Sequence, residues 1–360
     1  MSLKKSFWFV VRSLTFKKRE NNSLPKAALL SFCVVLFSFL FSYSQDTHFS
    51  QFDFSPLQQN AAHTGGFDGD YRFTAIHRNQ YKSVTIPYKT FSFSFDENIN
   101  VTEDSKKFWS AGILFNTDKA GDGDFKTLEL GLSVAYNYFL DAYKKQLVTV
   151  ALQPGIAQHS INFDNLYFDS QYNGDTYDPN IVSGEKLERT NYSYFDLNIG
   201  ANYFNKLSDG VDISVGLGLS HINNPNQSFY SEKNPLGSRF TAELLSKIKI
   251  TEVIYLHPQL LFYNQNKFQQ LNGGGKVQFV STKNESKQYS LSVGGYVRAK
   301  DAAIARVGVG YNNLDVGFAY DFNSSDLKRA SKGKGAYELG LIYIIKKVKP
   351  LKKHPPCPVY

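Results

Sequence analysis

The sequence predicts an all-β fold, a transmembrane antiparallel up-and-down β-barrel of about 14 strands. Three observations predict it. An export signal opens the chain, fourteen later segments alternate between apolar and polar residues, and the connections between those segments alternate in length. Alternation with a period of two is typical of strands with one apolar face, and unequal connections are typical of barrels in the bacterial outer membrane.

The composition excludes several classes of protein. With 42% hydrophobic residues and a mean hydropathy of -0.33, the 360-residue chain is too apolar for disorder and too interrupted for a bundle of membrane helices. The chain has 40 basic and 32 acidic residues, and residues 1–44 contain seven of the basic residues and one of the acidic residues. The remainder of the chain is therefore nearly neutral, and no nucleic-acid partner is expected. Two cysteines, Cys33 and Cys357, are too few for a disulfide scaffold or a cysteine zinc site.

Residues 1–44 are interpreted as a secretory signal peptide. A basic stretch precedes the apolar run from Ala27 to Phe41, and Ser42 and Ser44 supply the small residues that signal peptidase reads before Gln45. The alternative is a transmembrane anchor, but the run is short against the roughly 20 residues that a spanning helix needs. We therefore expect cleavage after Ser44.

The alternation is clearest from Thr127 to Tyr138, where Leu, Val and Tyr occupy one parity and Thr, Glu, Gly, Ser, Ala and Asn the other. Similar segments predict strands at 70–79, 88–96, 108–118, 126–139, 146–158, 193–204, 210–221, 238–250, 253–264, 268–281, 287–299, 302–311, 313–322 and 335–345. A soluble sandwich also alternates, but its second parity faces water and favours Lys, Glu and Thr. Here that parity is rich in Gly, Ser, Asn and Asp, which suit the interior of a barrel.

The connections predict the domain organisation. If the exported N-terminus stays periplasmic, the long stretches Ser160–Tyr192, Asn223–Gly237 and Asn323–Lys334 fall on the external side. The barrel should span residues 69–346, after an N-terminal periplasmic or plug segment at 45–68. Residues 347–360 should form a basic, proline-rich periplasmic tail. Both termini are thus expected on the periplasmic side of the outer membrane.

Short motifs occur in a fixed order along the mature chain. They are Gln45 to Phe52, Ser55-Pro56-Leu57, Asn60 to Gly65, Tyr71-Arg72, Arg78 to Tyr81, Pro87-Tyr88, Asp118 to Asp122, Phe163 to Asp178, Tyr194-Phe195-Asp196 and Cys357 to Tyr360. In this order the chain resembles the PorP/SprF family of Bacteroidetes outer-membrane proteins, which is associated with the type IX secretion system and gliding motility. It departs from the family's pattern at Ala61, where Pro is frequent, and at Tyr81, where Trp is frequent.

The resemblance implies a role that is not enzymatic. Members of this family are outer-membrane barrels that bind partner proteins and help to export or anchor them, notably large surface adhesins. The implied partners are a secreted adhesin or other type IX cargo, periplasmic type IX lipoprotein components and outer-membrane lipids, and no cofactor is implied. The alternative function is a passive channel or transporter for small solutes.

Candidate partner-binding or plug residues fall in three regions. The first region is in or near the segment before the barrel, where side chains could fill the lumen or contact a partner; it holds Phe49, Phe52, Asn60 and Arg78. The second is a long external stretch in which aromatic residues interleave with acidic ones; it holds Tyr167, Phe168, Tyr172 and Tyr177. The third is the basic tail, with Lys352 and Lys353. Aromatic side chains on an external loop are costly to leave in water, so they either pack over the barrel mouth or contact a partner.

No catalytic or metal site is predicted. The histidines are scattered, and only a barrel-housed hydrolase that uses His257 remains as an enzymatic alternative. Asp118, Asp122, Asp124 and Glu129 resemble part of a calcium loop, but Ala120 occupies a ligand position, so a hairpin turn is favoured. Inward charges should neutralise one another, because buried charges need partners; they are Arg72, Arg78, Glu129, Asp196, Asp212, Glu243, Lys247, Lys276, Arg298, Arg306 and Asp321.

Overall fold

The computed structural model describes residues 46–347 except 83, 85, 100, 102–104, 164–165, 186–187, 283–287 and 326–327. The expected signal peptide, Lys352, Lys353 and Cys357 lie outside the described residues. Among the described residues, no helix has the length and apolar character that crossing a membrane requires.

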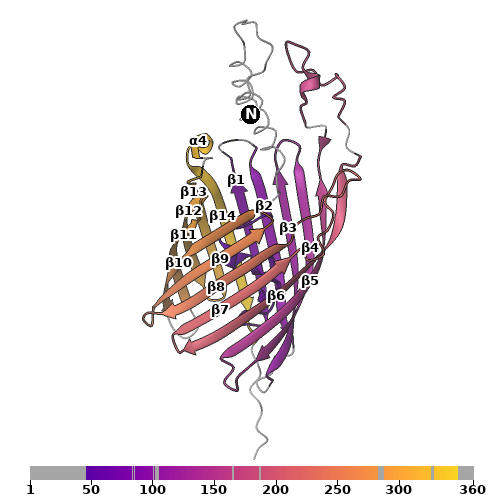
Figure 1. The fold of residues 1–360 in the computed structure, drawn as a ribbon. Coiled ribbons are helices and arrows are strands. Elements are labelled where there is room, and N and C mark those ends of the chain that lie inside the picture. Colours follow the sequence, from indigo (N-terminus) through magenta and orange to yellow (C-terminus); the bar gives the residue numbers. More distant parts are fainter. Residues whose placement is uncertain are drawn as a thin grey trace, which may run out of the picture. The chain divides into compact units, whose positions relative to one another are not determined.

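Fourteen antiparallel strands close into a barrel, in which each strand pairs with its neighbours in sequence and β1 pairs with β14 (Figure 1). The strands are β1 (Tyr71–Gln80), β2 (Tyr88–Ile99), β3 (Lys107–Ala120), β4 (Phe125–Phe139), β5 (Gln146–Ser160), β6 (Asn191–Ser208), β7 (Val211–Ser220), β8 (Arg239–Lys249), β9 (Ile254–Gln265), β10 (Phe268–Thr282), β11 (Gln288–Arg298), β12 (Ala302–Tyr311), β13 (Leu314–Asn323) and β14 (Lys334–Ile345). The predicted fold class and strand number are confirmed, and a sandwich is excluded by the closure.

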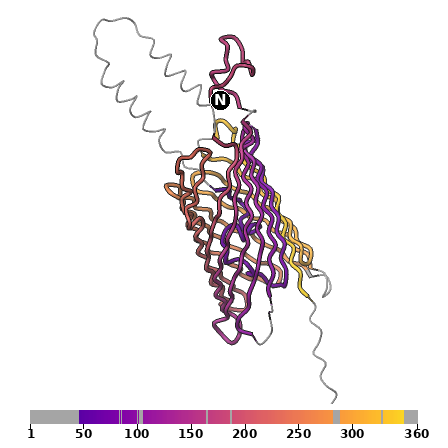
Figure 2. The backbone as a smooth tube through the Cα atoms, turned by 90° about the vertical axis from the view of Figure 1, so that its right-hand side faces the viewer, coloured from indigo at the N-terminus to yellow at the C-terminus, as the bar shows by residue number. Residues whose placement is uncertain are grey.

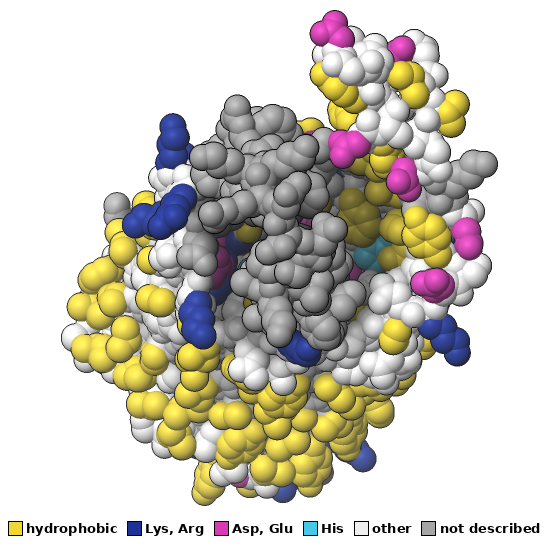
Figure 3. Space-filling view, turned by 45° about the horizontal axis from the view of Figure 1, so that its top comes forward, with side chains coloured by type: hydrophobic (Ala, Val, Ile, Leu, Met, Phe, Trp, Pro, Cys, Tyr) yellow, Lys and Arg dark blue, Asp and Glu magenta, His cyan; other side chains and the backbone are white. Residues whose placement is uncertain are grey.

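Burial alternates along the strands as the sequence pattern predicts. On β4, Ser133, Ala135 and Asn137 are buried, whereas Leu132 and Val134 are about half exposed. Exposed apolar side chains occur on the other strands too, and Figure 3 shows many hydrophobic side chains on the part of the outer wall that faces the viewer. Such a surface is stable only against lipid, as expected for a barrel in the outer membrane.

Connections that follow odd-numbered strands lie at one end of the barrel, and connections that follow even-numbered strands lie at the other end. We call the end with residues 81–87, 121–124, 161–190, 221–238, 266–267, 299–301 and 324–333 the loop end, and the other end the turn end. Residues 161–190 carry the short helix η4 (Asp169–Gln171) and project beyond the other connections (Figure 2). Residues 121–124 form the β3–β4 turn, as the hairpin interpretation of the calcium-like spacing expects.

The segment before β1 runs inside the barrel from the loop end to the turn end. It contains η1 (Phe52–Phe54), α3 (Pro56–Gln59) and η2 (Ala61–His63). Asp46 contacts Gln265 at the loop end of β9, and the N–H of Asp70 donates to the carbonyl of Ile345 at the turn end of β14. The described chain therefore enters the barrel at one end and leaves β14 at the other. The two termini, both expected on the periplasmic side, lie outside the described residues.

Aromatic residues of this segment make the hydrophobic core. Phe52 packs with Leu261, Tyr263, Tyr296, Ile304 and Ala319 from β9, β11, β12 and β13. Phe49 and Phe54 form a second cluster with Ile76 of β1. Because most inward side chains are small or polar, the barrel has few apolar groups of its own to bury. The segment supplies them, and its packing determines how the interior is filled.

Candidate functional site: the buried segment and the barrel interior

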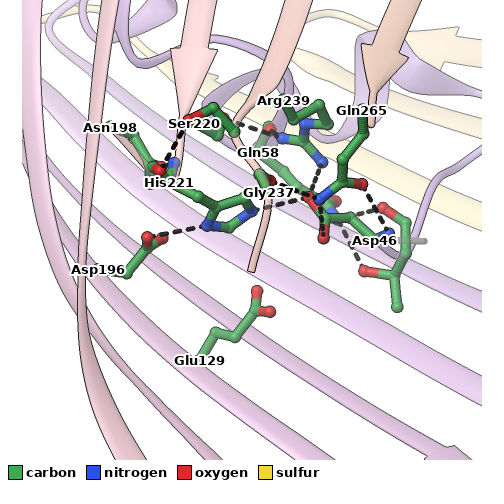
Figure 4. A network of polar contacts seen from close by, with 12 residues as sticks. Asp46, Gln58, Glu129, Asp196, Asn198, Ser220, His221, Gly237, Arg239 and Gln265 are labelled. Carbon is green, nitrogen blue, oxygen red and sulfur yellow. Dashed lines mark hydrogen bonds and ion pairs between the residues drawn. The ribbon is translucent and has the colours of Figure 1, made fainter. Parts of the chain in front are cut away.

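We call residues 46–70 the inner segment. Its first charged contact lies near the loop end, where His221 follows β7 and sits between two carboxylates (Figure 4). His221 Nε2 lies 2.8 Å from Asp46 Oδ2, and His221 Nδ1 lies 2.8 Å from Asp196 Oδ1. Arg239 Nη1 is 2.9 Å from Asp46 Oδ2, and Gln265 Nε2 donates to Asp46 Oδ1 at 3.1 Å.

These contacts fix the charge states of Asp46 and His221. Burial alone would lower the pKa of His221, but the carboxylates of Asp46 and Asp196 outweigh it and raise that pKa to about 10. Burial would raise the pKa of Asp46, but His221 and Arg239 hold it well below its usual range. Both side chains are therefore charged at neutral pH, and they attach the start of the inner segment to the β7–β8 connection and β8.

A second anchor holds the backbone of the inner segment. The N–H groups of Ser50 and Gln51 donate to the two carboxylate oxygens of Glu338 on β14, at 2.7 and 2.8 Å. The same carboxylate lies 2.5 Å from Arg78 Nη1, and Arg78 Nη2 lies 3.0 Å from Asp321 of β13. All of these side chains are buried, so the strands satisfy backbone donors that would otherwise be costly inside the barrel.

Asp53 makes the third anchor, in the middle of the segment. Its carboxylate lies 2.6 Å from Arg306 Nη1 on β12 and 3.1 Å from Lys276 Nζ on β10. The guanidinium of Arg306 also lies 4.8 Å from the centre of the Phe54 ring. A single carboxylate of the inner segment thus forms ion pairs with two cations that face the barrel interior.

Glu243 and Asp96 anchor the last part of the segment. His63 Nε2 lies 2.6 Å from Glu243 Oε1 on β8, and Asn60 Nδ2 donates to the same oxygen at 3.1 Å. Asp96 of β2 accepts from the N–H of Gly65 at 2.8 Å and pairs with Arg72 at 2.7 Å. The anchors therefore come from strands around most of the barrel wall, and they hold the segment on several sides.

The sequence profile of the family described as "Type IX secretion system membrane protein PorP/SprF" matches residues 41–343. The chain belongs to the PorP/SprF family. The match covers the inner segment and nearly all of the barrel, so the resemblance seen in the sequence motifs is confirmed. This PorP/SprF chain is accordingly an outer-membrane barrel of the type IX secretion system.

Solved structures similar to this PorP/SprF chain include other barrels. The Ralstonia pickettii toluene transporter TbuX aligns with a TM-score of 0.44 at 9% identity, over 80% of this chain and 92% of that one. A Pseudomonas aeruginosa FadL homologue gives 0.45 at 8% identity, over 79% and 92%. The translocator domain of NalP from Neisseria meningitidis gives 0.33 at 11%, over 88% and 99%. A search of curated proteins finds no match. Similarity at this level says nothing about what this PorP/SprF barrel binds.

The predicted site residues divide into two groups in the structure. Phe49, Phe52, Asn60 and Arg78 are all buried in the barrel interior, within or against the inner segment. Tyr167, Phe168, Tyr172 and Tyr177 lie together in the projecting loop, far along the chain from the first group. The Tyr167 and Tyr177 rings meet edge to face at 4.6 Å. Partner contact by either group stays a prediction.

Most of the expected inward charges are neutralised. Arg72, Arg78, Asp196, Glu243, Lys276, Arg298, Arg306 and Asp321 all form ion pairs, and Glu129 accepts a hydrogen bond from Asn116. The expectation fails for Glu129, whose described side-chain partner is the neutral Asn116, and for two further residues. Lys247 lies over the Tyr255 ring at 4.7 Å, and Asp212 forms no ion pair with a described residue. Both are near the turn end, where water can solvate a charge.

Sequence reasoning missed several partners of these charges. Asp96 and Glu338 share the inward parity of β2 and β14, and strand alternation could have identified both. His221, Asp46 and Asp53 lie outside the strands, where the period of two gives no indication of direction. His257, on which the hydrolase alternative depends, lies 3.0 Å from Gln278 Oε1. Among the described residues, no group of three His, Cys, Asp or Glu is arranged to hold a metal ion.

Proposed function

We propose that this PorP/SprF barrel serves the type IX secretion system by binding partner proteins and helping to export or anchor them. Large surface adhesins used in adhesion or gliding motility are the proposed cargo. Membership of the family supports this role, because its members are membrane proteins of that system. The alternative is a passive outer-membrane channel for small solutes.

The observation that carries the proposal is the packing of the inner segment. A passive channel needs a continuous aqueous path, whereas here Phe49, Phe52 and Phe54 are buried in the interior, each at 3% exposure or less. The charged anchors hold these rings in place on several sides of the barrel wall. A barrel whose interior is filled in this way favours binding at its outer surfaces over conduction through its lumen, and we propose that the inner segment acts as a plug.

The proposed binding surface for cargo is the projecting loop at 161–190. Tyr167 is 72% exposed and Tyr172 is 57% exposed, and exposed acidic residues such as Asp175 and Glu185 lie on the same loop. Figure 3 shows acidic and hydrophobic side chains together on this projection. Exposed tyrosines on a loop are well suited to anchor a partner, since their rings bury much area at a low entropic cost.

The orientation forms part of the proposal. We infer that residues 1–44 are removed on export, that the loop end faces outside and that the turn end faces the periplasm. The length of the 161–190 and 221–238 connections supports this orientation. The tail, with Lys352 and Lys353, would then reach periplasmic lipoprotein components and offer them positive charge.

The test is binding of the purified full-length barrel to the C-terminal region of a type IX adhesin encoded beside it. Replacing Tyr167 and Tyr172 by Ala should weaken binding by roughly tenfold or more. Tyr143→Ala is the matched control, because Tyr143 is 86% exposed in the β4–β5 turn at the opposite end. Binding that both variants retain would contradict the loop assignment. Large, steady conductance in a planar bilayer, without binding, would support the channel instead.

A further inference from the structure

Three lysines lie side by side on the outer face of the barrel at the loop end. Lys89 of β2 is directly opposite Lys119 of β3, and Lys119 is directly opposite Lys126 of β4. All three side chains are exposed. Like charges directly opposite one another on a sheet destabilise it, so a row of three has a cost that a bound anion would remove.

The row lines a cleft of about 480 Å³. His77 of β1 and the hydroxyl-bearing Thr117 and Ser160 also line it. One carboxylate is present, because Asp124 Oδ1 lies 2.8 Å from Lys119 Nζ. Among the described lining residues, Lys89 and Lys126 form no ion pair, and positive charge therefore exceeds negative charge in the cleft.

The cleft lies where the apolar outer face begins. The next outward-facing row toward the middle of the barrel is Phe91, Thr117 and Leu128, and the row after it is Phe93, Phe115 and Leu130. Each row is two residues further along the strands, or about 7 Å. The lysines are thus one row beyond aromatic and aliphatic side chains that face lipid, which is the height of the lipid headgroups.

We propose that this cleft binds the phosphorylated headgroup of a glycolipid of the lipid A class in the external leaflet. Lysine ammonium groups bind phosphate as point charges, and the row offers two that no described carboxylate neutralises. The acyl chains of the same molecule would lie along Phe91 and Leu128. A basic pocket at the membrane surface is the arrangement that recognises anionic headgroups. The assignment goes beyond the proposed function and uses only the proposed orientation.

The test compares lipids that differ in phosphate. Full-length barrel in a neutral detergent is titrated with lipid A, dephosphorylated lipid A, phosphatidylglycerol or inorganic phosphate, and native mass spectrometry measures binding. The test variant replaces Lys89 and Lys126 by Gln, leaving the Lys119–Asp124 pair intact. The control replaces Lys233 and Lys328 by Gln, because these are exposed at the loop end and do not line the cleft. A difference in gel mobility between unheated and heated protein shows that each variant is folded.

We expect the K89Q/K126Q variant to bind lipid A about 30-fold more weakly, since each lysine near a membrane surface contributes on the order of a five- to sixfold gain. The K233Q/K328Q control should bind as the wild type does, and replacing Lys89 and Lys126 by Arg should preserve binding. Unchanged binding in K89Q/K126Q, or equal binding of dephosphorylated lipid A, overturns the proposal. Equal affinity for inorganic phosphate or phosphatidylglycerol overturns the assignment to the glycolipid.

Discussion

The ring of Phe54 occupies the space that a side chain at Gly340 would fill. A Cβ atom at Gly340 would lie 2.6 Å from Cδ1 of that ring, and Gly317 on the neighbouring strand leaves similar room. Two glycines on β14 and β13 therefore form a slot in the barrel wall for an aromatic residue of the inner segment. The position of the inner segment therefore depends on the missing side chains at these glycines as well as on the charged side chains of the strands.

Gly340→Leu should displace Phe54 and loosen the inner segment. Overpacking of this kind costs about 1–3 kcal/mol, and we expect a lower unfolding temperature in detergent together with conductance that the wild type lacks. Gly295→Leu is the control, because nothing lies within 4 Å of a Cβ placed there on β11. If the Gly340→Leu variant had the unfolding temperature of the wild type and no conductance, Phe54 would not obstruct the lumen.

Asp53→Asn should leave Lys276 and Arg306 without their shared carboxylate. Breaking a buried pair from one side costs about 3–5 kcal/mol, because an uncompensated charge stays behind. The double variant Asp53→Asn with Arg306→Gln should recover part of that loss, and denaturant unfolding in detergent measures both. Strictly additive losses would mean that Asp53 and Arg306 do not interact in the folded barrel.

The contact of Asp46 with His221 predicts a pH dependence. The folded-state pKa of His221 is raised from an ordinary 6.5 to about 10, so its contribution to stability is complete below pH 6.5 and is lost as pH rises through about 10. The pKa of Asp46 is lowered, so its contribution to stability is complete at pH values above the ordinary pKa of an aspartate and is lost as the pH falls into the acid range. The difference in unfolding free energy between the wild type and His221→Gln should therefore shrink from pH 7 to pH 11. A constant difference would contradict the assigned charge on His221.

Gly65→Ala separates steric crowding from backbone strain. Gly65 has a φ of 77°, and a Cβ there would lie 2.0 Å from Ser110 Oγ and 2.3 Å from Asn98 Oδ1. Gly174→Ala is the matched control, because Gly174 has a φ of 99° and open space around it. Strain alone costs about 1–2 kcal/mol, and we expect Gly65→Ala to lose clearly more in thermal unfolding. Equal losses of stability in the two variants would mean that residue 65 and Ser110 can move apart without a cost in free energy.

The strands could be predicted from the sequence because lipid and a polar interior impose opposite demands on alternate residues. The predicted range 302–311 matches β12, and most other strand ends agree within two residues. Bounds were less accurate at β6, predicted at 193–204 and found at Asn191–Ser208, because both of its ends extend beyond the alternating core of the strand. Arg78 and Asp321 were expected inside for the same reason, and they pair there.

The path of the inner segment could not be predicted, since residues before the first strand have no periodic pattern. Phe49 and Phe52 were candidates for a plug or a partner contact, and composition alone could not decide between a periplasmic and an interior position. Their burial depends on contacts that are distant in sequence, such as those of Ser50 with Glu338 and of Asp53 with Arg306. Such pairings become visible only once the strands are arranged around the segment.

The direction of the inner segment restricts the order of assembly. Asp46 is at the loop end, while the segment joins β1 at the turn end, so its whole length lies within the ring that the β1–β14 seam completes. If a bulky folded domain preceded Asp46, that domain would have to be at the loop end before β1 paired with β14 and closed the ring. A short epitope tag placed there would instead emerge beside the β7–β8 connection. Antibody labelling of intact cells carrying such a tag would therefore report which mouth of the barrel opens to the medium.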